Sequence, residues 1–171
     1  MVVHDLAVNS GINMPDATVQ KFSGNQYTYI SKRFDRQPGN KRIHFASAMT
    51  MLGCKDGDNY SIGLSYLDLA GFIMQSGDKN HVNADLHELW KRIVFNICVK
   101  NTDDHLRNHG FLLGKNGWKL SLAFDINPVP TGVLTKAIGV SSRSIERNIK
   151  ARAKLLPKWE YFETEQGHGS F

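Results

Sequence analysis

One polar stretch limits what this chain can fold into. The segment VKNTDDHLRNHGFLL, residues 99–113, holds two adjacent carboxylates, two imidazoles, an arginine and two asparagines. Mostly apolar residues precede it at 93–99 and follow it at 111–113. A buried strand cannot contain so many polar groups, because each would need a hydrogen-bond partner inside the protein. The sequence therefore predicts a loop rich in chemically active side chains between two elements of the core.

The front part of the chain predicts β-structure. Two runs rich in β-branched and aromatic residues, 17–22 and 26–34, flank a Ser-Gly-Asn turn, as in a β-hairpin. Before them, Gly11 and Pro15 predict the end of a helix, because glycine suits a helix cap and proline forbids continuation. After them, residues 35–42 are expected to form a polar loop.

The back part predicts helices. Apolar residues recur at steps of three and four from Phe45 onward, which indicates amphipathic helices. The predicted helical segments are 45–52, 65–77 and 84–100. In the last one, a broad stripe is expected to be buried: Leu86, Leu89, Trp90, Ile93, Val94 and Ile97. A short hairpin turning on residues 114–117 should follow the polar loop, and the basic tail 134–162 is expected to be helical.

Composition and charge narrow the functional classes. A chain of 171 residues with a net charge of +5 fits one domain, and its charge favours acidic partners such as phosphates or nucleic acid. We find no signal peptide, and no apolar stretch approaches the roughly 20 residues needed to cross a bilayer. Cys54 and Cys98 follow no disulfide framework, so a soluble, cytoplasmic protein is expected. Cys98 is expected to be a small buried residue.

Three side chains have the spacing of a kinase site. Asp103 and Asn108 are five residues apart, and Asp125 follows 17 residues later. In kinases one carboxylate accepts the proton of the attacking hydroxyl, while an amide oxygen and a second carboxylate hold Mg²⁺ across the nucleotide phosphates. The D-x-x-x-x-N spacing matches the eukaryotic catalytic loop, although Asp and Asn are also ordinary loop residues. We expect the oxygens of all three to lie within about 8 Å of one another in one cleft.

A family resemblance adds to this pattern. FNICVKNTDDHLRNHGFLL and LSLAFDINP, with SKRFDR and RIHFASAMTMLG upstream, resemble the catalytic core of the HipA-like serine/threonine kinases, the toxins of bacterial toxin–antitoxin pairs. The resemblance covers roughly residues 6–138. It implies an α+β, protein-kinase-like fold with a small β-hairpin front part and a mostly helical C-lobe. We expect one domain over 1–171, with 1–36 as a remnant of the N-lobe and connecting segment and 37–171 as the C-lobe.

The resemblance also implies roles for individual residues, with ATP and Mg²⁺ as cofactors. The matching positions are Asp103, His105 and Arg107 for catalysis, Asn108 and Asp125 for Mg²⁺, and Lys32, Arg33, Phe34 and Asp35 for the nucleotide. In the family, backbone groups of the segment 32–35 hold the adenine, and this segment should border the same cleft as the metal ligands. Arg107 stands where a lysine is common, and an arginine can bind phosphate oxygens bidentately.

The chain also departs from the family pattern. A kinase needs a loop over the phosphates and a phosphate-binding lysine. No glycine-rich loop precedes Gly11. Lys21 lies on the wrong strand to be the phosphate-binding lysine. The phosphate-binding strands are therefore expected to be absent, which favours a fragment that binds ATP weakly. The resemblance implies a translation-related protein substrate, such as an aminoacyl-tRNA synthetase, and a small DNA-binding antitoxin as partner. Because no apolar stretch is long enough to cross a bilayer, no membrane partner is expected.

Two alternatives stay open. The segment 134–155, a Gly-Val-Ser turn between basic helical stretches, is typical of a helix-turn-helix, and Arg143 and Arg147 could contact DNA. The chain could then be a catalytically inactive binding module that contacts DNA or an antitoxin. His105 and His109, four residues apart, could instead bind zinc from one helical face.

Overall fold

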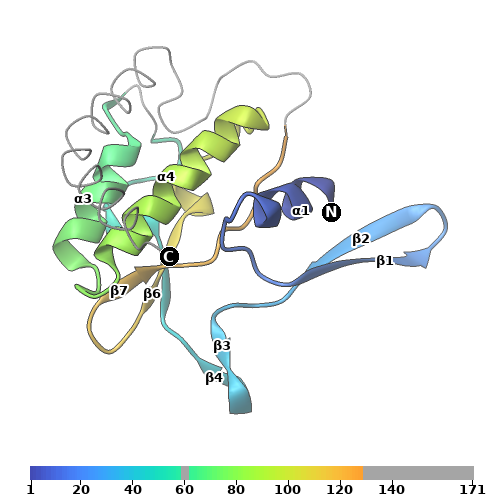
Figure 1. Ribbon diagram of the computed structural model, residues 1–171, viewed down its shortest axis with the longest axis horizontal. Helices are drawn as coiled ribbons and strands as arrows, with labels where there is room; N and C mark the ends of the chain where they lie inside the picture. The colour runs from blue at the N-terminus through green and yellow to red at the C-terminus, as the bar shows by residue number, and fades with distance from the viewer. Residues whose placement is uncertain (59–61, 129–171) are drawn as a thin grey trace, which may run out of the picture.

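The computed structural model describes residues 1–58 and 62–128 (Figure 1). These residues form an α+β fold, as predicted. The front elements are α1 (Val2–Asn9), β1 (Ala17–Ser23), β2 (Gln26–Ser31), β3 (Arg36–Gln37), η1 (Pro38–Asn40) and β4 (Lys41–Arg42). The back elements are β5 (Phe45–Ser47), α2 (Ala48–Met51), α3 (Tyr66–Ser76), α4 (Val82–Cys98), η3 (Leu106–Asn108), β6 (Gly110–Leu113) and β7 (Trp118–Leu120).

The main core lies between two helices and a small antiparallel sheet. Helices α3 and α4 pack beside each other and against the sheet of order β5-β6-β7 (Figure 1). Phe111 of β6 and Leu69 of α3 are both buried in this core. Phe111 pairs with Leu120 in the sheet, and paired residues share a face. The face with Phe111 is therefore covered by helices, and the opposite face carries Leu112 and its partner Lys119.

A second, smaller core joins the two ends of the described chain. Ala7 of α1, Ile12, Phe95 of α4 and Ala123 are buried together. The backbone N–H of Ala123 donates to the carbonyl of Asn13 at 2.8 Å. The segment that follows α1 thus lies beside the segment that leads from β7 toward Asp125.

The predicted helix from Phe45 is wrong for its first three residues. Phe45 to Ser47 form β5, which pairs with β6 through Phe45↔Leu112 and Ser47↔Gly110. The predicted helix is confirmed from Ala48 onward, and the Ser47 side chain caps α2 by accepting from the N–H of Thr50 at 3.2 Å. The edge of β6 offers hydrogen bonds that a local pattern cannot reveal, and tertiary pairing overrides propensity here.

The predicted stripe of α4 is also partly wrong. Leu89 is buried, but Val94 is 36 % exposed and Ile97 is 41 % exposed. Cys98 is exposed, against the expectation of burial. The buried face instead includes three polar residues four apart: Glu88, Arg92 and Asn96. Side chains at steps of four share a helix face, and these three can be buried because each has internal partners.

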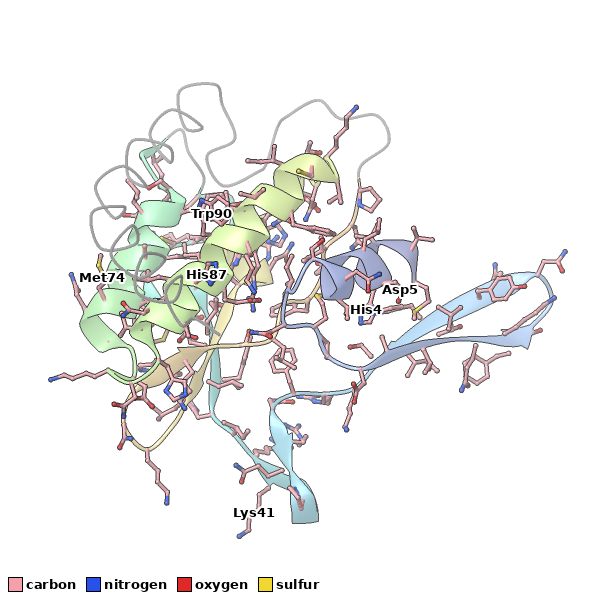
Figure 2. All side chains as sticks on the ribbon, in the orientation of Figure 1. His4, Asp5, Lys41, Met74, His87 and Trp90 are labelled. Carbon is pink, nitrogen blue, oxygen red and sulfur yellow. The ribbon has the colours of Figure 1, made fainter. Side chains whose placement is uncertain are left out.

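The predicted front hairpin is confirmed but is almost wholly exposed. Strands β1 and β2 pair from Ala17↔Ser31 to Ser23↔Gln26, and Figure 1 shows them extending away from the helices. Figure 2 shows side chains on both faces of this hairpin. The polar loop predicted at 35–42 contains the short β3–β4 pair, with Lys41 near its tip (Figure 2).

Some expectations concern residues that the structure does not describe. The basic helical tail, including the helix-turn-helix segment 134–155, lies outside the described residues, and the division of the chain at residue 36 stays a prediction. Within residues 1–58 and 62–128, no helix has the length and apolar character needed to span a bilayer.

Candidate active site

The predicted catalytic loop connects α4 to β6. Asp103 is exposed, and its carboxylate has no hydrogen-bond or ion-pair partner among the described residues. Its backbone is held on both sides: the N–H donates to Oδ1 of Asn101 at 3.4 Å, and the carbonyl accepts from Nδ2 of Asn108 at 3.2 Å. Asn108 itself is buried. The loop thus brings Asp103 and Asn108 together, with the Asp103 carboxylate open to solvent.

A buried carboxylate lies directly behind the loop. Asp104 is 2 % exposed. Its Oδ2 accepts from the hydroxyl of Tyr66 and from Nδ2 of Asn96, the latter at 2.8 Å, and its Oδ1 lies 3.0 Å from Nε2 of His109. Burial favours the neutral acid, but His109 and the hydrogen bonds hold the pKa of Asp104 below its usual range. Burial, together with Asp104, raises the pKa of Tyr66 well above its usual range, so the phenol stays a donor.

His105 and Arg107 also lie in this loop. Arg107 forms an ion pair with Asp56, from the segment after α2, and its Nη2 lies 3.2 Å from Nε2 of His105. His109 instead contacts Asp104, so the two imidazoles predicted as possible zinc ligands have different partners. The described residues contain no group of three or more His, Cys, Asp or Glu side chains placed to hold a metal ion together.

Asp125 follows the second predicted hairpin, which is confirmed. Gly114 N–H donates to the Gly117 carbonyl at 2.9 Å, and Ser121 N–H donates to the Gly110 carbonyl at 2.8 Å. The exit of the hairpin therefore lies beside its entrance. Asn108 lies two residues before Gly110, and Asp125 lies four residues after Ser121. The topology thus supports the predicted convergence, but the distance within one cleft stays a prediction.

Asp125 has an unusual backbone. It is exposed, its φ is +56°, and its Oδ1 accepts from Nδ2 of Asn127 at 2.7 Å. Positive φ is uncommon for a residue other than glycine, although Asp is one of the residues that tolerate it. An outlier of this kind is consistent with a functional position.

The segment 32–35 is held by ion pairs and aromatic contacts. Asp35 accepts from Arg33 at 2.8 Å through Nε and at 2.6 Å through Nη2, and it also pairs with Arg36. The bonds from Arg33 lower the pKa of Asp35 to about 2. The ring of Phe34 lies 5.9 Å from that of Phe45 and 5.7 Å from that of Phe124, centre to centre. Phe34 therefore packs against the residue that directly precedes Asp125.

A cleft of about 530 Å³ lies between this segment and the hairpin β6–β7. Lys32, Arg33 and Phe34 form part of its wall. Leu112 and Lys119, from the sheet face turned away from α3 and α4, form another part. Asp103, Asn108, Asp125 and Asp35 are not among its lining residues. The structure thus places the expected nucleotide segment at a cleft, with the expected chemical groups outside its lining.

A buried ion pair on α4 joins the segments around the site. Arg92 donates from Nε to Glu88 Oε1 at 2.9 Å and from Nη2 to the carbonyl of Ser121 at 2.7 Å. Glu88 Oε1 also accepts from the N–H of Asn13 at 3.0 Å. One pair of side chains therefore fixes the chain before the front hairpin and the segment that leads to Asp125.

Sequence reasoning missed the buried polar residues behind the loop. Tyr66 lies outside the quoted motifs, and Asn96 and Asn101 lie within FNICVKNTDDHLRNHGFLL without an assigned role. Nothing in two adjacent aspartates shows that Asp104 is the buried one. One signal was available: Glu88, Arg92 and Asn96 recur every four residues along a predicted helix, a spacing that puts polar groups on one face.

Comparisons with known proteins agree with this picture. The family model for the HipA-like C-terminal domain matches residues 1–168. A Haemophilus influenzae protein named "Putative kinase" is 29 % identical in an alignment 133 positions long, which covers 70 % of this chain and 38 % of that protein. A chain from the structure of the Shewanella oneidensis MR-1 toxin–antitoxin system HipA, HipB and its operator DNA superposes with a TM-score of 0.65 and 20 % identity.

The structural match covers 79 % of this chain and 35 % of the Shewanella chain. This chain therefore spans less than two fifths of the length of either protein, and at this identity the superposition shows the fold alone. The predicted family is confirmed by the family model, which covers nearly the whole sequence. The chain belongs to the HipA-like C-terminal domain family.

Proposed function

We propose that this chain is the catalytic C-lobe part of a HipA-like serine/threonine protein kinase, which transfers the γ-phosphoryl group of ATP to a protein hydroxyl with Mg²⁺. One observation carries the proposal. The hydrogen bond from Asn108 Nδ2 to the Asp103 carbonyl holds two groups of the expected kinase set side by side. It leaves the Asp103 carboxylate without a partner among the described residues, as a proton acceptor requires.

Asp103 would accept the proton of the attacking hydroxyl. The hydroxyl oxygen bonds to the γ-phosphorus, the bond from that phosphorus to the leaving ADP oxygen breaks, and the proton passes to the Asp103 carboxylate. Arg107 lies in the same loop, and we propose that it offsets phosphate charge, with His105 beside it at 3.2 Å. In this structure Arg107 pairs with Asp56, so phosphate oxygens would take the place of that carboxylate.

The residues present fit a magnesium site. Asn108 uses its Nδ2 toward Asp103, and its Oδ1 has no hydrogen-bond partner in the described part of the chain. Asp125 adds an exposed carboxylate. These are hard oxygen donors, and few are needed because phosphates and water complete the coordination of Mg²⁺. When bound, Mg²⁺ would neutralise charge on the nucleotide phosphates.

We propose that the cleft beside Lys32, Arg33 and Phe34 takes the nucleotide base. Its wall includes Leu112, which can pack against an aromatic ring. Phe34 packs on Phe124, so a nucleotide with its base in this cleft can direct its phosphates toward the neighbouring Asp125. Asp35 would then act by holding Arg33 in place rather than by touching the base, because its own oxygens already bind arginines.

The proposed partners follow from the family and from the structural relative. The Shewanella structure contains HipA, HipB and operator DNA. We propose that this protein acts in the cytoplasm and also binds an antitoxin and, directly or through it, DNA. A translation-related protein is the proposed substrate. The alternative, an inactive module that keeps only these binding partners, differs in one measurable respect: it transfers no phosphate.

The test compares Asp103→Ala with Asp5→Ala, which removes an exposed carboxylate from α1. Transfer from γ-labelled ATP with Mg²⁺ to proteins of a bacterial extract should fall by about 10²- to 10⁴-fold for Asp103→Ala, the usual contribution of a positioned acid or base. Asp5→Ala should transfer at the wild-type rate. Both should unfold in urea like the wild type. Undiminished transfer by Asp103→Ala would refute the assignment. Because the phosphate-covering loop and lysine are not expected within residues 1–171, the binding module is favoured if a longer protein that contains this chain and those two elements labels nothing.

A further inference from the structure

We propose that Asp104 is a positioning residue for the loop: its buried carboxylate holds Asp103 and Asn108 in place through Asn96 and Asn101. This inference rests on the proposed function of Asp103 and extends it. Asp104 is not one of the groups expected to touch substrate or nucleotide, and it faces away from solvent.

The first step is that Asp104 ties together three separate elements. Tyr66 comes from the first turn of α3, Asn96 from the last turns of α4, and His109 from the residue just before β6. All three contact the same carboxylate. Since both of its oxygens are engaged, the side chain of Asp104 has one orientation in which every donor is satisfied.

The second step connects this carboxylate to Asp103. Asn96 donates to Asp104 at 2.8 Å and accepts at its own Oδ1 from Nδ2 of Asn101 at 3.2 Å. The Oδ1 of Asn101 in turn accepts from the N–H of Asp103. An unbroken series of hydrogen bonds therefore runs from Asp104 to the backbone of Asp103, and Asn108 completes the support from the other side.

The third step is that this loop depends on side chains for its shape. The N–H of Asp103 bonds to a side chain, not to a neighbouring strand. Lys100, with a φ of +55°, belongs to the cap of α4: its N–H donates to the carbonyl of Ile97 at 3.2 Å, and the N–H of Asn101 donates to that of Asn96 at 2.9 Å. After this cap, residues 102–104 make no backbone–backbone hydrogen bond among the described residues, so the side-chain network holds them in place.

The fourth step is that the network needs a carboxylate. An ionised Asp only accepts hydrogen bonds, whereas an Asn has one acceptor oxygen and an NH₂ donor. Asp104→Asn would keep the shape of the side chain and place that NH₂ either against the donors from Tyr66 and Asn96 or against His109 Nε2, which can accept from it only as the Nδ1–H tautomer. The remaining bonds would lose their charged acceptor, so the attachment of the loop would weaken.

The experiment uses residues 1–171 and three variants. Asp104→Asn removes the carboxylate, and Tyr66→Phe removes one donor more gently. Ile73→Ala is the control, because Ile73 is buried on the same helix as Tyr66 and lies outside the network. Hydrogen–deuterium exchange is measured on peptides covering 99–109. In parallel, kcat and KM for ATP are measured for transfer to the extract proteins that the wild type labels.

In Asp104→Asn, the backbone amides of residues 99–109 should exchange at least about tenfold faster than in the wild type. The reason is that losing one hydrogen bond to a charged group makes local opening of the loop easier by about that factor. Tyr66→Phe should show a smaller increase in exchange rate in the same peptides. Ile73→Ala should speed exchange there only as much as its loss of overall stability speeds exchange in the rest of the protein. For Asp104→Asn, kcat should fall by about tenfold or more while KM for ATP changes by less than about twofold, as for a loss felt mainly in the transition state.

The outcomes separate this inference from the proposed function. If residues 1–171 transfer no phosphate but the loop loosens only in the network variants, the positioning role stands, and the kinase proposal is decided by transfer in a longer protein that contains the phosphate-binding loop and lysine. If the loop exchanges as in the wild type when Asp104 is changed, or if Ile73→Ala loosens it equally, the positioning role is wrong even where transfer is observed. A matched fall in kcat for Asp104→Asn and the control would overturn it as well.

Discussion

Replacing Tyr66 by phenylalanine should destabilise the protein by about 2 kcal/mol. The Tyr66 hydroxyl is buried and donates to the ionised, buried Asp104. Hydrogen bonds to charged groups contribute about 1.5–3 kcal/mol, and the acceptor here has no access to water as a substitute donor. Phenylalanine keeps the ring and its contacts, so no core volume other than the hydroxyl is lost. With a urea slope of about 2 kcal/mol/M, the unfolding midpoint should fall by roughly 1 M.

Urea unfolding followed by circular dichroism measures this change. Tyr27→Phe is the matched control, because Tyr27 is 70 % exposed on the front hairpin and its hydroxyl can bond to water. The control should unfold within about 0.5 kcal/mol of the wild type, as surface substitutions usually do. If Tyr66→Phe and Tyr27→Phe have the same midpoint, the buried hydrogen bond contributes nothing measurable and the reasoning about the network is wrong.

The same variant should be more sensitive to acid. Because the folded-state pKa of Asp104 is lowered, its contribution to stability is complete above the unfolded-state pKa of about 4 and is lost as the pH falls through the folded value. The Tyr66 hydrogen bond is one of the causes of that lowering. Without it the folded pKa rises, so Tyr66→Phe should begin to unfold at a higher pH than the wild type. An unchanged acid transition would contradict this.

Three other substitutions test the fold. Gly110→Ala would place a methyl group against the ring of Phe45 and should lower stability by about 1–3 kcal/mol; an unchanged melting temperature would disprove the clash. Arg92→Met breaks the buried pair with Glu88 and should cost about 3–5 kcal/mol in urea titrations; a loss below about 1 kcal/mol would contradict the role of the pair. Since the pKa of Asp35 is about 2, Asp35→Asn should be less stable than the wild type above about pH 4, and this difference should shrink as the pH falls toward and through about 2; a constant difference across this range would exclude the ion pairs as the cause.

The sequence predicted the elements whose pattern is local. The helix expected at 84–100 is α4 at Val82–Cys98, and the hairpin expected at 114–117 joins β6 to β7. Each depends on periodicity or turn chemistry within about 20 residues, where local preference and tertiary structure agree. Strand β5 could not be predicted, because its hydrogen bonds go to residues more than 60 positions away in the sequence.

The candidate site also has one part that the sequence predicted and one part that it could not predict. A motif match identified Asp103 and Asn108, and the structure holds them together. Burial within the loop follows neither a helical nor a strand period, so the sequence could not show that Asp104 points inward while Asp103 points outward. The ligands expected for Mg²⁺ and ATP stay predictions, since their support is positional.

The contacts of Glu88 have a consequence for how the protein forms during synthesis. The hydrogen bond from Asn13 to Glu88 joins residues 75 positions apart, whereas His109 and Asp104 are five apart. Closing the longer loop costs about 2 kcal/mol more in chain entropy. At roughly 5–20 residues per second, the ribosome needs about 4–15 s after Asn13 to make its acceptor. For that interval the N-terminal segment has no anchor on α4, and the front hairpin that follows it is a nascent β-ribbon with free edges.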